Sequence, residues 1–186
     1  GISHTAVAAF VGADKAAFYE CAFFSHGTTL FDYKGRHYYD NCYIQGSTDV
    51  IFGHGQAMFH ECEVFVVGGS IAANQRRSHK ESSGFVFVKG RVYGVGDVHL
   101  GRAKGSHSRV VFANTYLSRT VIPQGWTIWN YQGSTQNLHH AEYKCHGPGS
   151  DSVNRVHWSK QLADKEAAPF LTVDFIKGKE WLLAWF

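Results

Sequence analysis

Proline and long apolar runs are scarce in this chain. Three prolines against 20 glycines suit many tight turns between short strands. No apolar run is long enough to span a bilayer, so we expect no membrane segment. The sequence shows no signal peptide, and its abrupt start at Gly1, without a polar cap, leads us to expect a fragment or a processed chain.

Net charge is small as well. The formal net charge is +3 and the pI is near 8.7. This charge is compatible with an acidic polymer as partner and equally with an ordinary solvated surface, and nothing else indicates nucleic acid. A hydrophobic fraction of 44% in 186 residues predicts one folded domain that covers the whole chain, 1–186.

Signals for ligand binding are weak when residue types are taken alone. The 12 histidines, including the adjacent His139 and His140, lack metal-ligand spacing, so we interpret them as surface residues and expect no metal. Trp126 and Trp129 suit stacking on sugar rings, although core packing is the favoured interpretation. The chain has no Asn-X-Ser/Thr sequon for glycosylation.

The chain does contain a repeat built on short aromatic and β-branched runs. Phe18–Phe23 is echoed by Tyr39–Ile44 and again by Met58–Val64. Looser copies lie at Phe85–Val92 and Val110–Leu117. Strand-like runs that recur in this way, with Gly, Ser and Asp between them, are typical of a stacked solenoid. We therefore predict an all-β fold, a right-handed parallel β-helix.

The repeat places cysteines, and one pair of polar residues, at equivalent positions. Cys21 and Cys42 are 21 residues apart and Cys62 follows 20 residues later, which favours stacked, buried thiols over the disulfides of a secreted protein. Thr28 and Asp49 both follow a repeat cysteine by seven residues. They should lie on adjacent coils, roughly 4.8 Å apart, where a hydrolase can hold a nucleophile and its acid partner. Here only one of the two is a carboxylate.

Two polar segments interrupt the repeat and are expected to form loops. They are Gly68–Ser83 and Gly94–Ser108, and such insertions on a solenoid often build a wall of a binding face. Further on, Asp164–Ala168 predicts a short helix limited by Pro169. The aromatic tail Phe170–Phe186 is expected to pack back on the solenoid.

Two motifs resemble those of the plant pectin methylesterases, or pectinesterases. Gly46–Gly53, GSTDVIFG, is similar to the family signature GxxDFIFG, and Leu100–Ala103 is similar to LGRxW. The likeness covers essentially the whole chain, including Asp14–Tyr19 and Pro123–Trp126. It implies the pectin-lyase-like β-helix. Because the family enzyme is longer at its N-terminus, it also implies that the first coils are missing.

The resemblance further implies hydrolysis of methyl esters on homogalacturonan without metal or cofactor. In the family one Asp attacks the ester carbonyl and a second Asp acts as acid and then base, while two Gln donate to the oxyanion. Carried over by position, Asp49 falls at the nucleophile and Arg102 at the arginine that holds it. Both are intact, and an arginine fork keeps a carboxylate ionised and aimed.

The other catalytic positions depart from the family pattern. Thr28 stands at the acid position, and Gly27 and Thr5 stand at the two oxyanion glutamine positions. A threonine hydroxyl cannot supply a proton near neutral pH as a carboxylic acid can. Losing the acid costs about 10²- to 10⁴-fold in rate, and each oxyanion donor costs about 10²- to 10³-fold. We therefore expect a much weakened esterase.

Three further residues are expected, by resemblance, to contact substrate. They are Phe52, His26 in place of an aromatic residue, and Lys104 in place of the tryptophan after LGR. His26 is two positions from Thr28, so on a strand both would point to one face and His26 would be placed to donate the missing proton. The alternative is a His26 that faces solvent or sugar. The hydroxyl of Thr5 offers one oxyanion hydrogen bond.

Three functions follow as alternatives. The first is a pectinesterase; the second is a non-catalytic protein that binds demethylated pectin through Lys104 and the loop cations Arg76, Arg77 and Lys80. The third is a catalytic relic with a regulatory role. By resemblance the partners are pectin and a proteinaceous pectinesterase inhibitor, the location is the cell wall after secretion, and the expected state is a monomer.

Overall fold

The structure of the protein is a computed structural model that describes residues 6–183. Its strands are β1 (Ala9–Val11), β2 (Ala16–Tyr19), β3 (Ala22–Phe24), β4 (Leu30–Asp32), β5 (Arg36–Asp40), β6 (Tyr43–Gly46), β7 (Ile51–Gly53), β8 (Gln56–His60), β9 (Glu63–Asn74), β10 (Gly84–Val88), β11 (Arg91–Arg102), β12 (Arg109–Ala113), β13 (Tyr116–Leu117), β14 (Trp126–Thr127), β15 (His139–Tyr143) and β16 (Lys160–Gln161). Its helices are α1 (Asp164–Ala167) and the 3₁₀ helices η1 (Ala168–Phe170), η2 (Val173–Ile176) and η3 (Gly178–Glu180).

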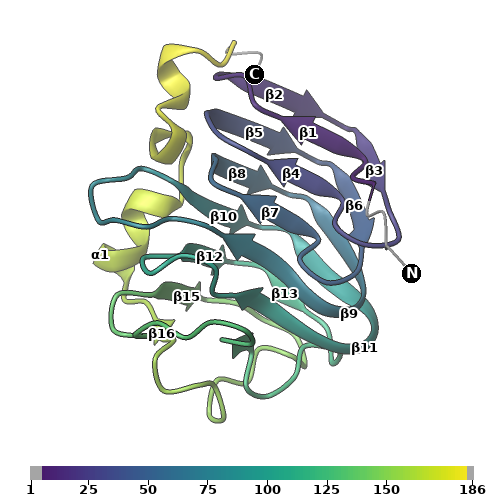
Figure 1. Cartoon of the computed structure of the whole chain (residues 1–186), viewed down its shortest axis with the longest axis vertical. Coiled ribbons are helices and arrows are strands. Elements are labelled where there is room, and N and C mark those ends of the chain that lie inside the picture. Colours follow the sequence, from purple (N-terminus) through teal and green to yellow (C-terminus); the bar gives the residue numbers. More distant parts are fainter. Residues whose placement is uncertain (1–5, 184–186) are drawn as a thin grey trace.

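The strands wind into a parallel β-helix, as predicted (Figure 1). Every pairing between named strands is parallel. One sheet has the order β16-β15-β12-β10-β8-β5-β2, and the other contains the path β1-β4-β7-β9-β11-β13. The first half of β9 pairs with β6 and its second half with β7, so this long strand serves two faces of the solenoid.

A ladder of aromatic rings fills the inside of the solenoid. Consecutive coils contribute Phe18, Tyr39, Phe59, Phe87 and Phe112, whose ring centroids are 5.0, 4.6, 4.7 and 4.3 Å apart and whose planes lie within 12° of parallel. These spacings match the distance of about 4.8 Å between neighbouring strands. One aromatic residue per repeat therefore fixes the register of the coils through stacking as well as through burial.

The predicted cysteine stack is also present. Cys42 and Cys62 are buried, Cys21 on the first described coils is half-buried, and all are free thiols. Burial with apolar neighbours explains their shared repeat position without any covalent link.

Both predicted loops are shorter than expected. The first part of Gly68–Ser83 continues β9, which ends at Asn74, and most of Gly94–Ser108 continues β11, which ends at Arg102. Glycines at positive φ bend these strands without ending their pairing, and β11 shifts register between Val95 and Val98. The true loops are residues 75–83 and 103–108.

The C-terminal tail packs along the seven-stranded sheet, as predicted (Figure 1). Phe175 and Ile176 are buried in a cluster with Met58 and Val86. The predicted short helix is present as α1, which ends at Ala167 before Pro169, and Pro169 lies in the first turn of the following 3₁₀ helix η1. Proline is tolerated there since the first-turn N–H has no helical partner.

A buried ion pair joins the last coils. Arg155 and Glu142 have side chains 4% and 1% exposed, and the guanidinium donates to both carboxylate oxygens at 2.8 and 3.0 Å. The same guanidinium also donates to the carbonyls of Ile122, Pro123 and Gly149. Arg155 therefore fastens two irregular segments to β15.

A buried histidine joins the first two coils. Nδ1 of His37 lies 2.8 Å from Oδ2 of Asp32, and Nε2 lies 2.9 Å from the Ala13 carbonyl oxygen. Because both ring nitrogens face acceptors, the doubly protonated ring satisfies both. Burial acts to lower the pKa of His37, but the hydrogen bonds and charge of Asp32 and the Ala13 carbonyl outweigh it, and the pKa is raised.

We expect this contact to make the free energy of unfolding decrease as the pH rises. The pKa of His37 is higher in the folded chain, so its contribution is complete below the unfolded pKa of about 6.5 and is lost as pH rises through the folded value. Urea unfolding of the parent and of His37→Gln, from about pH 6 to about pH 9, measures the effect. The variant should lack this part of the pH dependence, and equal slopes in both proteins would refute the assignment.

Candidate active site

Asp49 lies in a tight turn between β6 and β7. Thr48 and Asp49 have φ values of 40° and 56°, and a β-branched residue at positive φ is an outlier that stores about 1–3 kcal/mol. Gly69 on the next coil allows this turn, because a Cβ there would lie 2.9 Å from the Thr48 Cα. The surrounding coils thus hold the Asp49 backbone in a conformation that it would not adopt alone.

The Asp49 carboxylate is held from two sides. Nε of Arg102 donates to Oδ1 at 2.9 Å and a second guanidinium nitrogen donates to Oδ2, so the contact is a bidentate fork. Ser70 donates from Oγ to Oδ1 at 2.6 Å and accepts from the Asp49 N–H at 3.0 Å. Asp49 is 7% exposed, and this arrangement fixes the orientation of its carboxylate.

Ser70 was not predicted from the sequence as a site residue, although the coil register implied its position. The pairing of Leu30 with Ile51 and of Ile51 with Ala72 makes positions 28, 49 and 70 equivalent on successive coils. The same register that predicted Thr28 beside Asp49 therefore predicts Ser70 on the other side.

The positions that the resemblance assigns to the acid and the oxyanion donors carry no carboxyl or amide group in the described part of the chain. Thr28 is half-buried, and its Oγ lies 3.5 Å from the Thr48 carbonyl oxygen. Gly27 contributes only backbone, and its carbonyl accepts from the Ser47 N–H at 3.1 Å. Thr5 lies outside the described residues. The structure therefore places Thr28 and Gly27 beside the Asp49 turn without supplying an acid.

His26 does not lie on a strand, contrary to the premise used to orient it. Residues 25–29 form a bend between β3 and β4, so strand alternation does not apply to His26 and Thr28. The His26 side chain is exposed, and its backbone carbonyl accepts from Ser47 Oγ at 2.6 Å. Only the backbone of His26 has an observed contact at the site.

The two tryptophans have different positions. Trp126 is 1% exposed and belongs to the core, as favoured from the sequence, whereas Trp129 is 62% exposed. The Arg102 guanidinium lies 5.0 Å from the Trp129 ring centroid and also contacts its carbonyl oxygen. Trp129 therefore belongs to the site and presents an open aromatic face beside Asp49 and its arginine.

An outward row of aromatic rings flanks the site. Phe10, Phe31 and Phe52 are in register on β1, β4 and β7, with centroids 5.1 and 5.2 Å apart. Sequence reasoning named only Phe52, although the 21-residue offset links all three. Lys104 is exposed in the loop after Arg102. Such a row gives sugar rings an apolar surface next to a polar site.

The cations of the loop 75–83 do not join Asp49. Arg76 is buried and donates to the backbone carbonyls of His79, Glu81 and His107, so it supports the loop. Arg102 is already engaged by Asp49. Arg76 therefore does not contribute to binding of substrate carboxylates at the Asp49 site, as the binding hypothesis required.

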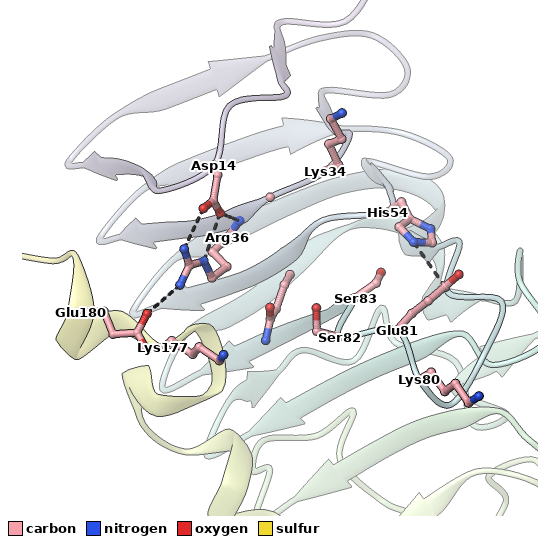
Figure 2. A pocket seen from close by; sticks show the side chains of 12 residues that line it. Asp14, Lys34, Arg36, His54, Lys80, Glu81, Ser82, Ser83, Lys177 and Glu180 are labelled. Atoms are coloured by element: carbon pink, nitrogen blue, oxygen red, sulfur yellow. Dashed lines mark hydrogen bonds and ion pairs between the residues drawn. The ribbon is translucent and has the colours of Figure 1, made fainter.

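A cavity of about 690 Å³ lies at another corner of the solenoid, beside the C-terminal tail (Figure 2). Arg36 bridges Asp14 at 2.7 Å and Glu180 at 3.1 Å, and His54 pairs with Glu81 at 3.3 Å. None of the residues placed at the Asp49 site lines this cavity. Its paired charges link the tail to the solenoid.

Within residues 6–183, no cluster of three or more His, Cys, Asp or Glu side chains is arranged to hold a metal ion. In the same range, no helix is long and apolar enough to cross a membrane.

The fold and the site define a parallel β-helix with a carboxylate–arginine pair that spans its coils. A family model described as Pectinesterase matches residues 1–179, and the chain belongs to the pectinesterase family. It is 58% identical to "Probable pectinesterase 67" of Arabidopsis thaliana over 96% of its own length and 54% of that protein. It is 47% identical to "Putative pectinesterase 11" of the same plant, covering 98% of this chain and 53% of that protein. The chain thus spans about half the length of these relatives.

Solved structures agree with this family. The structure of pectin methylesterase from carrot superposes with a TM-score of 0.90 at 27% identity, covering 95% of this chain and 61% of that one. A pectin methylesterase from Aspergillus niger gives a TM-score of 0.88 at 28% identity, over 100% of this chain and 62% of that one.

Proposed function

We propose that the chain acts on pectin as a pectinesterase of low turnover, with Asp49 as nucleophile. The observation that carries this proposal is the buried Asp49 carboxylate, which the Arg102 fork and the Ser70 hydroxyl hold in one orientation. Family membership supports the substrate class. In keeping with that class, a pectin methylesterase 22% identical to this chain has been solved in complex with a hexasaccharide. By the same kinship we propose a cell-wall location.

In this mechanism an Asp49 oxygen attacks the methyl ester carbonyl. The oxyanion collapses, the bond to methoxide breaks, and a proton must reach the leaving oxygen as methanol departs. Water then hydrolyses the mixed anhydride and restores the carboxylate. Arg102 and Ser70 hold the attacking carboxylate in a fixed orientation. Because Thr28 offers no carboxylic acid, the proton comes from water, which explains the low turnover that we propose.

Methanol release from highly methylated pectin tests the proposal. We expect slow release by the parent and none above the protein-free rate for Asp49→Asn, because an amide is neither anionic nor nucleophilic. Asp151→Asn is a matched control, since Asp151 is exposed and remote in sequence from the site. Equal release by the parent and Asp49→Asn would exclude Asp49 as the nucleophile.

A second candidate function is pectin binding without catalysis. It is favoured by the combination of a missing acid at Thr28 with an exposed Trp129 and the aromatic row that ends at Phe52. This candidate predicts no methanol release, together with binding of low-methyl pectin that weakens as salt is added. Release that depends on Asp49 would eliminate it.

A further inference from the structure

A pocket of about 490 Å³ lies between the loops 75–83 and 103–108, β15, β16 and the start of the C-terminal tail. Its volume lies in the range of about 300–1,000 Å³ common for small-ligand sites. We call it the cationic pocket, and its titratable lining residues are Arg76, His79, His107, Arg109, His139 and Lys160. Among the described residues that line it there is no Asp or Glu, and neither Asp49 nor Arg102 takes part.

Carbonyl groups, not carboxylates, satisfy the two arginines. Arg109 donates to the carbonyl oxygens of Ser82 and Ser83 at distances of 2.5–3.0 Å, and Arg76 is bonded to three backbone carbonyls. Neither arginine forms a salt bridge with a carboxylate of the described residues, and the charge of Glu81 acts on Arg76 only from a distance. The pKa of Arg109 falls to about 10 because of burial and the nearby charge of Arg76.

The pKa of His139 is affected by the same excess of positive charge. Its pKa falls to about 4, first because of burial and then because of Lys160, Arg109 and Arg76. Its buried Nε2 has no hydrogen-bond partner among the described residues. Holding like charges together costs free energy unless an anion joins them.

The two carboxylates whose charges act on Arg76 and His139 already accept hydrogen bonds from backbone N–H groups. Glu81 accepts from the Arg77 N–H at 2.8 Å and Glu166 accepts from the Ala163 N–H at 2.8 Å. Neither lines the cationic pocket. Among the described residues, therefore, no carboxylate enters the cationic pocket, and Glu81 and Glu166 offset its positive charge only from outside.

We propose that the cationic pocket is a binding site for an oxyanion, a carboxylate or a phosphate group, separate from the Asp49 site. Arginine forks match the geometry of both groups, and Lys160 adds a mobile charge at the rim. A carboxylate would come from an unesterified uronate unit, and a phosphate from a free or ester-linked phosphate.

Calorimetric titration with two probes tests the site and distinguishes the sources. The probes are inorganic phosphate and a short, fully unesterified galacturonate oligomer. We expect Lys160→Glu to weaken binding of at least one probe about tenfold, since one attraction becomes a repulsion. Lys160→Gln should give a smaller loss in the same direction. Lys160 is exposed, so neither change should disturb folding.

Lys34→Glu is the matched control, because Lys34 is an exposed lysine that lines the other cavity. It changes the net charge equally and should bind both probes as the parent does. The probe that is weakened in Lys160→Glu identifies the source of the anion. Failure of both probes to bind, unchanged binding of both in Lys160→Glu, or equal loss in both charge reversals would overturn the proposal. Titration in an Asp49→Asn background keeps the result independent of esterase activity.

Discussion

Arg155→Met should lower the free energy of unfolding by about 3–5 kcal/mol, because it leaves the buried Glu142 carboxylate without its partner. The Glu142 side chain is 1% exposed, so solvent cannot replace the guanidinium. The variant also removes donors from the carbonyls of Ile122, Pro123 and Gly149. Urea unfolding followed by circular dichroism measures the change.

Two comparisons separate this effect from a general loss of charge. Replacing both partners, Arg155→Met with Glu142→Leu, should recover much of the loss, since no buried charge is then left alone. Lys144→Met removes the exposed pair of Lys144 with Asp164, at 3.0 Å, and should leave stability unchanged. If Arg155→Met lowers the free energy of unfolding no more than Lys144→Met does, the buried pair does not stabilise the fold.

The coil register could be predicted because the same residue types return at the same step. Cys42 and Cys62 occupy one equivalent position on successive coils, and Tyr39 and Phe59 occupy another. Strands β5 and β8 pair in the register that these residues predict. The loop boundaries could not be predicted in this way. Gly68 and Gly69 resemble a turn in sequence, yet hydrogen bonds to two neighbouring coils keep that part of the chain in a strand.

The site was only partly predictable, for similar physical reasons. The resemblance assigned Asp49 and Arg102 to one site although they are 53 residues apart in sequence, and the structure places them in contact. Ser70 follows from the register alone and was missed only because the register was not extended by one coil. By contrast, Trp126 and Trp129 lie in an irregular segment, where residue spacing does not predict which side chains face the core. Trp126 is buried and Trp129 is exposed.

Pairs in irregular segments have no such signal. Glu142 lies on the regular strand β15, but Arg155, 13 residues later, lies in an irregular segment, and no periodicity relates the two. The contact depends on how the segments before β14 and after β15 fold over the last coils, which is set by the tertiary structure.

Thr28→Asp should raise methanol release by about 10²-fold or more, because it returns a carboxylic acid to the coil next to Asp49. Threonine and aspartate have similar volumes, and Thr28 is half-buried with only a long contact to the Thr48 carbonyl at 3.5 Å. A second carboxyl beside the Asp49 carboxylate favours its protonated form, because like charges at close range disfavour a second ionisation. The introduced group then holds a proton for departing methanol and can act as base for water.

Thr28→Asn is the matched control, since an amide has the same shape as a carboxyl but cannot transfer the proton. A rise in Thr28→Asp alone would show that the esterase site is complete except for its acid. Equal rates in the two variants would contradict the acid role of this position. If neither variant releases methanol while both bind low-methyl pectin, the missing acid is not what limits the site. The oxyanion positions at Gly27 and Thr5 then become the deciding difference, and pectin binding becomes the better account of the chain.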